Sequence, residues 1–331
     1  MKIFLVLVAL VFFHSAAHAN DYVVSESDQS AVIEKIADHL RLDYVEPDVG
    51  ARAADVLEAD LQSGRFAEFR DGQAFADALS ARLQGLTGDG HLNVDFSIKA
   101  LYLSAPAEDS FGAAEMERYY GAHLNFGVET VGRLNGNVGY LDLRVFAPIE
   151  MGAETVTAAM NVVAHTDGLI IDLRENGGGI GDMADLVASY LFDGERRPLT
   201  GVYDRPTNTL TQRYTQPHVP GIRFGGEKPI YVLISKKTFS AAEALAYNLQ
   251  ALKRVTVIGE VSGGGAHPFE YLPIHPHFVL WSVTAKSVNP ITGGNWQGVG
   301  VQPDIHVPAD RALETALQHL AVRKSAQSPA D

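Results

Sequence analysis

The sequence predicts an α/β fold preceded by a small helical bundle, and two patterns support this. Residues about 27–86 place apolar side chains at helical spacing, with polar residues between them. From about residue 122 onward, short runs rich in β-branched residues alternate with helical stretches. Strands that alternate with helices usually build a parallel or mixed sheet that is covered by helices. We therefore expect a bundle first and a sheet domain after it.

Three helices are expected in the bundle. The first stops near Glu46-Pro47-Asp48, the second runs to Ser63-Gly64, and the third closes at Thr87-Gly88-Asp89-Gly90. Their apolar faces are Val32, Ile33, Ile36, Ala37, Leu40 and Tyr44, then Ala53, Ala54, Leu57 and Leu61, then Phe75, Leu79 and Leu83.

The second half supplies strands and helices in alternation. Strands are expected at 138–146, 168–173, 230–234, 255–258 and 277–284, and helices at 154–163, 183–191, 241–252 and 311–322. The chain thus divides into a bundle at 20–95, a connector at 96–121, an α/β domain at 122–322 and a flexible polar tail at 323–331.

The first 19 residues have the pattern of a secretory signal peptide. Lys2 precedes an apolar run at 3–13, and small residues lead to Ala17-His18-Ala19, so cleavage is expected between Ala19 and Asn20. The apolar run is shorter than the about 20 residues that span a bilayer. We expect an exported protein, periplasmic or extracellular, without stable membrane insertion.

Composition narrows the classes of partner. The formal net charge is −14 and becomes −15 once Lys2 is removed with the leader, which argues against nucleic acid as a partner. The chain has no cysteine, so disulfides, thiolate metal sites and a cysteine nucleophile are excluded. No motif indicates a metal or an organic cofactor, and no pattern defines an oligomeric state.

The strongest candidate for chemistry is Ser240. The segment Thr238-Phe-Ser-Ala-Ala-Glu243 follows the apolar run 229–235 and precedes a helical pattern. The first amides of a helix have no intrahelical acceptor, so they can stabilise negative charge that develops beside a serine there. On the local pattern alone, Ser240 is either a nucleophile or a helix-capping serine.

Three further segments are candidates for the same site. Asp172-Leu-Arg-Glu-Asn-Gly-Gly-Gly179 follows a buried strand, and its glycines can aim amides into a cleft. Gly88-Asp89-Gly90-His91 places a histidine in a tight turn, where it is either a general base or a structural residue. The glycine-rich segment 295–304 contains Gln297.

Two other groups have competing interpretations. His267, His275 and His277 are close in sequence, but no acidic or cysteine ligands accompany them at zinc-site spacing. Lys236 and Lys237 precede Ser240 and either could reach back to it, although lysines before a turn are usually solvated.

Four ordered motifs resemble the S41 family of serine peptidases, which includes the tail-specific processing peptidases, the tricorn core and the modules of the interphotoreceptor retinoid-binding protein. They are Gly168-Leu-Ile-Ile-Asp-Leu-Arg-Glu-Asn-Gly-Gly-Gly179, Thr238-Phe-Ser-Ala-Ala-Glu243, Gly259-Glu260 and Gly298-Val-Gly-Val-Gln-Pro-Asp304. The resemblance covers nearly the whole mature chain. It implies a ClpP/crotonase-like ββα core and a peptide or protein substrate.

The subgroup follows from two departures. Only about 30 residues separate His91 from Asn125, too few for the PDZ domain of the processing peptidases. The lysine of the family's Ser-Lys dyad falls on Gly265 here, so that dyad is not expected. The chain is therefore most similar to the retinoid-binding and tricorn-like branch without a PDZ domain.

The resemblance assigns roles to five residues. Ser240 would be the nucleophile, His91 the general base, and the amides of Gly178 and Ala241 the oxyanion hole. Gln297 would support His91 at a position where tricorn-like sites carry a glutamate.

Two substitutions in this chain leave the support of the base open. Gly90 also replaces a serine of tricorn-like sites, and Asp89 or Glu243 could take the place of the missing carboxylate. The alternative to a peptidase is a weakly active or inactive module on the same fold that binds a hydrophobic small molecule or a peptide.

Overall fold

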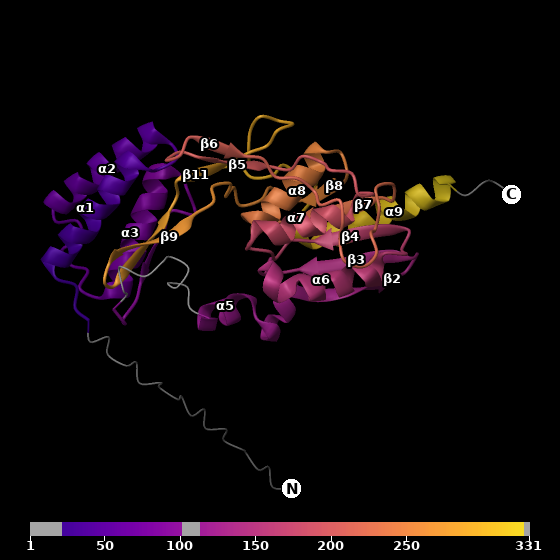
Figure 1. The fold of residues 1–331 in the computed structure, drawn as a ribbon, viewed down its shortest axis with the longest axis horizontal. Helices are drawn as coiled ribbons and strands as arrows, with labels where there is room; N and C mark the ends of the chain where they lie inside the picture. Colours follow the sequence, from indigo (N-terminus) through magenta and orange to yellow (C-terminus); the bar gives the residue numbers. More distant parts are fainter. Residues whose placement is uncertain (1–21, 101–112, 328–331) are drawn as a thin grey trace, which may run out of the picture.

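The computed structural model describes residues 22–100 and 113–327 (Figure 1). The expected signal peptide at 1–19 lies outside these residues. In the described part of the chain, no helix is long and apolar enough to cross a membrane.

Three helices form the N-terminal unit, drawn in indigo and purple in Figure 1. They are α1 (Glu26–Leu42), α2 (Pro47–Gln62) and α3 (Gly72–Thr87), as the apolar periodicity predicts. Glu46-Pro47 was expected as the end of the first helix, but α1 already ends at Leu42 and Glu46-Pro47 starts the second helix, because proline suits the first helical turn. Helix α3 ends at Gly88, whose φ of 69° is easily adopted only without a side chain.

Strands from both halves of the chain complete the core of this unit. An antiparallel sheet joins β1 (Val94–Phe96), β10 (Phe278–Ser282) and β9 (Glu270–His275) in that order. Phe278 and Leu280 are fully buried in the same core as α1–α3, and the Phe278 ring meets Phe75 edge-on at 5.5 Å. The bundle expected at 20–95 is therefore packed against a strand pair that the sequence places in the second domain.

The central sheet of the second unit has six strands in the order β12-β8-β7-β4-β3-β2. All pairs are parallel except β2 with β3. The strands are β2 (Val128–Leu134), β3 (Val138–Leu143), β4 (Gly168–Asp172), β7 (Ile230–Ile234), β8 (Thr256–Gly259) and β12 (Ile305–His306). This agrees with the predicted parallel or mixed sheet.

Helices cover both faces of the central sheet. Helices α6 (Ile149–Val163), α7 (Gly181–Tyr190) and α8 (Ala241–Ala251) share one core with alternate strand residues such as Val232, while the neighbouring Leu233 faces α9 (Ala312–Gln327). Helix α9 continues to Gln327, so residues 323–327 are helical although the sequence predicts a flexible tail from 323; Ala, Arg, Lys and Gln all favour helix.

The remaining elements are short. An antiparallel sheet of β11 (Ala285–Val288), β5 (Gly201–Asp204) and β6 (Thr209–Thr211) lies between the two units in Figure 1. Within the expected connector, α5 (Ala113–Tyr120) precedes a 3-10 segment, Ala122–Gly127. The described residues contain no separate PDZ domain.

Candidate active site

Ser240 lies in the turn between β7 and α8, with φ 54° and ψ −121°. A positive φ is uncommon for a residue with a side chain, and such strain is maintained only where the surroundings enforce it. The parallel order of the sheet brings this turn beside the loop that follows β4, and the amide of Phe239 donates to the carbonyl of Asn176 at 3.1 Å. The turn is thus fixed from two sides.

The first amide of α8 is available beside Ser240. Within the described residues, the N–H of Ala241 has no hydrogen-bond acceptor. Gly178 also lies against the serine, since a Cβ at 178 would come within 2.7 Å of Ser240 Cβ. The amide of Gly178, however, donates to Asn176 Oδ1 at 2.8 Å. Of the two expected oxyanion donors, Ala241 is free and Gly178 is occupied.

Glu243 explains how the turn is held. Its buried carboxylate accepts the amides of Ser240 at 2.8 Å, Gly264 at 2.7 Å and Gly265 at 2.8 Å, and the hydroxyl of Ser262 at 2.5 Å. Burial raises the pKa of Glu243, and these four donors act in the opposite direction. Glu243 therefore ties the loop at 262–265 to the backbone of Ser240 and has no lone pair directed at His91.

His91 lies in the turn after α3 and is only 3% exposed. Its ring packs between Phe239, at a centroid distance of 4.7 Å, and Phe269, at 5.5 Å. The Nδ1 atom is buried and has no hydrogen-bond partner in the described structure. Burial is the main reason that the pKa of His91 falls to about 4, opposed by the charge of Asp89. The imidazole is therefore neutral at pH 7, the form that accepts a proton.

Contacts through Phe239 and Gly265 place His91 beside the nucleophile turn. Phe239 precedes Ser240, and a Cβ at Gly265 would lie 2.7 Å from His91 Cε1 and 2.2 Å from Phe239 Cζ. Among the described residues, no hydrogen bond joins Ser240 Oγ to the imidazole. The two rings occupy the space that a side chain at position 265 would enter, which gives a physical reason for glycine there.

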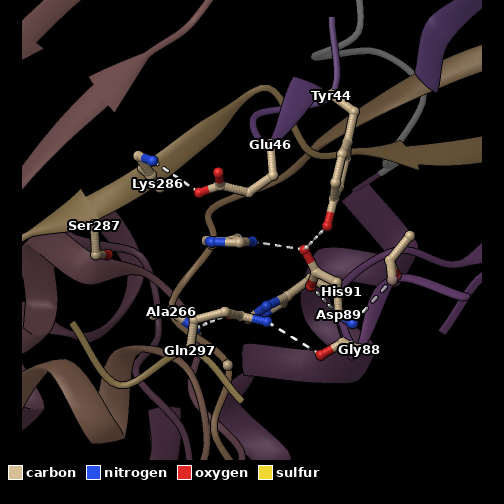
Figure 2. A network of polar contacts seen from close by, with 12 residues as sticks. Tyr44, Glu46, Gly88, Asp89, His91, Ala266, Lys286, Ser287 and Gln297 are labelled. Atoms are coloured by element: carbon tan, nitrogen blue, oxygen red, sulfur yellow. Dashed lines mark hydrogen bonds and ion pairs between the residues drawn. The ribbon is translucent and has the colours of Figure 1, made fainter. Parts of the chain in front are cut away.

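Asp89 is fully buried and is surrounded by donors (Figure 2). Its Oδ1 accepts the amide of His91 at 3.0 Å, and its Oδ2 accepts the Tyr44 hydroxyl at 3.1 Å and lies 2.7 Å from His267 Nδ1. Burial raises the pKa of Asp89, but the hydrogen bond and charge of His267 hold it below its ordinary value. The carboxylate is thus ionised in the protein interior.

Gln297 bridges two loops and makes no hydrogen bond to the His91 ring. Its Oε1 accepts the amide of Ala266 at 2.8 Å, and its Nε2 donates to the carbonyl of Gly88 at 3.4 Å (Figure 2). Gln297 therefore fastens the turn that carries His91 to the segment that follows Gly265.

The other sequence candidates lie elsewhere. Lys237 is 68% exposed and is ion-paired with Glu175 at 2.7 Å. The His275 and His277 rings are 6.1 Å apart, whereas His267 is engaged with Asp89. Within the described ranges, no cluster of histidine and acidic side chains is suited to hold a metal ion.

Comparison with known families agrees with this architecture. Residues 137–307 match the profile of peptidase family S41, and residues 17–131 match that of the N-terminal domain of peptidase S41 in eukaryotic IRBP. The chain belongs to peptidase family S41. The expected α/β fold with an N-terminal helical bundle is confirmed.

The individual relatives of this S41 chain have low sequence identity to it. A carboxy-terminal-processing protease of Bartonella bacilliformis is 30% identical over 188 residues, which are 53% of this chain and 40% of that protein. A putative peptidase from Parabacteroides merdae has a TM-score of 0.62 at 20% identity, covering 92% of this chain and all of the other. A lipoprotein from Streptococcus agalactiae has a TM-score of 0.58 at 15% identity, covering 98% and 100%. The two solved structures share the fold of this chain.

Tyr44 and His267 contact Asp89 in this S41 site, and neither contact was expected from the sequence. His267 is 178 residues from Asp89 along the chain, and Tyr44 is 45 residues from it. Asp89 itself was expected from the sequence as one of two acids that could take the place of the missing carboxylate, but no local pattern linked it to Tyr44 or His267.

Proposed function

We propose that this S41 chain is an exported serine peptidase that cleaves peptide bonds through an acyl-enzyme on Ser240. The observation that carries the proposal is the backbone of Ser240, held at φ 54° at the start of α8 beside the free amide of Ala241. Strained backbone of this kind concentrates at functional sites. A serine that only capped the helix would sit in the extended region, as Ser25 does with φ −83° and ψ 166°.

The mechanism is acyl transfer in two stages. His91 accepts the proton of Ser240 Oγ as the oxygen attacks the substrate carbonyl, and the amide of Ala241 holds the resulting oxyanion. Gly178 contributes a second donor when its amide exchanges Asn176 Oδ1 for that oxyanion. His91 then gives the proton to the leaving amine, and water hydrolyses the ester with His91 again as base.

The first proton transfer requires the imidazole to come within hydrogen-bond distance of Ser240 Oγ. Catalytic hydrogen bonds often shorten only when substrate is bound, so we expect the two groups to close together in the substrate complex. Gln297 serves here as a positioning residue, because it holds the Gly88 carbonyl in the turn that carries the base.

Export is part of the same proposal. It rests on the leader at 1–19, with cleavage expected near Ala19-Asn20. The substrate class is peptide or protein, as the family suggests. The position of the mature N-terminus in secreted material tests the export step.

Hydrolysis of an unbiased peptide library by the mature chain tests the activity. We expect cleavage by wild type and none by Ser240→Ala or His91→Ala at equal folded concentration. Cleavage that persists in Ser240→Ala would refute the nucleophile. Absence of cleavage in wild type, together with saturable binding of an apolar ligand or peptide, would favour the binding-module alternative.

A further inference from the structure

We propose that Asp89 supplies the negative charge that supports the His91 imidazolium, and that His267 and Tyr44 hold Asp89 in place for this task. The inference rests on the proposed role of His91 and extends it. Asp89 acts through His91, so it is a positioning residue in this scheme.

The need for such a group follows from the site itself. His91 is 3% exposed and its Nδ1 has no partner, so a proton taken from Ser240 would create a buried cation with little solvation. Such a cation is stable only beside a compensating negative charge. Gln297, at the position of the tricorn-like glutamate, is neutral and donates and accepts elsewhere.

Asp89 fits the requirement by geometry. Its Oδ1 accepts the amide of His91 at 3.0 Å, which places the carboxylate on the same turn as the imidazole. Glu243, the other buried acid in the site, directs its carboxylate at four donors around Ser240. Of the described titratable groups, Asp89 and His267 are those whose charge shifts the pKa of His91.

The surrounding elements keep Asp89 ionised and fixed. His267 comes from the loop before β9, and Tyr44 from the turn after α1; both contact Oδ2 of Asp89, and Figure 2 shows the Tyr44 hydroxyl directed at that carboxylate. A carboxylate partner at Nδ1 sets the tautomer of His267, which donates from Nδ1. Among the described residues, Glu46 and Lys286 lie nearby and are paired with each other at 2.7 Å, and the guanidinium of Arg205 donates to the carbonyl of Tyr44.

This arrangement also joins the two units of the molecule. Tyr44 and Asp89 belong to the helical unit, and His267 belongs to the loop that continues from the glycines bound by Glu243. The contacts at Asp89 therefore fix the position of the His91 turn relative to the turn of Ser240. Charge and position are supplied by one carboxylate.

The test is the rate of Ser240 labelling by a fluorophosphonate as a function of pH, in Asp89→Asn, His267→Asn and His267→Phe. Asp89→Asn should lower the rate about tenfold or more and move the acid midpoint of the profile to lower pH, because loss of the negative charge lowers the pKa of His91. His267→Asn keeps a donor near the Nδ1 position and should stay within about threefold of wild type, whereas His267→Phe should approach Asp89→Asn.

Controls separate charge from general damage. His39→Phe removes another buried histidine, one that contacts Ser282, and should leave the labelling rate unchanged. A slower Asp89→Asn with an unmoved midpoint would refute the charge role, as would equal rates for His267→Asn and His267→Phe. If Asp89→Asn does not fold, the comparison of the two His267 variants decides between these outcomes.

A measurement that does not depend on catalytic activity distinguishes this inference from the proposed function. The His91 ring can be titrated by NMR in wild type and Asp89→Asn. A lower pKa in the variant supports the inference even if wild type is not labelled, an outcome that would count against the proposed function alone. An unchanged His91 pKa would overturn the inference.

Discussion

Replacing Gly265 with alanine tests the placement of His91 with a single methyl group. The added Cβ would lie 2.2 Å from Phe239 Cζ and 2.7 Å from His91 Cε1, against an ordinary contact of 3.4 Å. Phe239 must therefore retreat by about 1.2 Å and the imidazole by about 0.7 Å to relieve the overlap. Gly265 does not have a left-handed φ, so the backbone accepts alanine and the effect comes from the side chain.

We expect Gly265→Ala to slow the reaction without unfolding the protein. Overpacking of this size costs about 1–3 kcal/mol of unfolding free energy. A catalytic group displaced by about 1 Å can cost about 100-fold in rate. We therefore expect Gly265→Ala to fold and to acylate about 100-fold more slowly than wild type, measured as the second-order rate of fluorophosphonate labelling.

A matched glycine provides the control. Gly177 also lies outside the left-handed region, and a Cβ there meets no atom within 4 Å. Gly177→Ala should therefore label at the wild-type rate. If Gly265→Ala labels as fast as Gly177→Ala, the imidazole is not held where the contacts at position 265 place it.

Three further predictions concern neighbouring groups. Since the pKa of His91 is about 4 in the folded state and about 6.5 when unfolded, the unfolded state binds the proton first. The free energy of unfolding should therefore fall by up to about 3 kcal/mol from this group as the pH drops from about 6.5 to 4. Urea titrations should show a smaller fall in His91→Phe than in wild type, and an equal fall in both proteins would contradict the burial of His91. Glu243→Gln places an NH2 donor against groups that already donate to this side chain. Urea unfolding should therefore show a free energy of unfolding about 2–3 kcal/mol lower than in wild type, and labelling of Ser240 should be abolished. Wild-type stability and labelling would exclude the four-donor arrangement. Gln297→Glu keeps an acceptor for the Ala266 amide but loses the donor to the Gly88 carbonyl, so its rate should not exceed that of wild type, and a faster variant would show that position 297 acts on the base directly.

Local periodicity was enough for most of the fold. The three bundle helices and the strands β3, β4, β7 and β8 follow apolar patterns that short segments display by themselves. The pairing of β1 with β10 could not be predicted in the same way, because it joins residues such as Val94 and Leu280 that are far apart in the chain. Strand β12 has only two residues, too few for a period.

The candidate site divides in the same manner. Ser240 lies in the expected strand-to-helix turn, but its positive φ is imposed by tertiary contacts and cannot be predicted from the residue type. Asn176, which takes the amide of Gly178, was part of the recognised glycine segment, but the direction of its side chain was not readable. The His267–Asp89 contact depends on two units packing together, so residue types alone left His267 as a possible zinc ligand.

The most direct test of the central claim is the site of covalent attachment after fluorophosphonate treatment, determined by mass spectrometry of proteolytic fragments. We expect one adduct, on Ser240, that is lost in Ser240→Ala and strongly slowed in His91→Ala. An adduct on another residue, or labelling of His91→Ala at the wild-type rate, would contradict the assignment of Ser240 as nucleophile and His91 as its base.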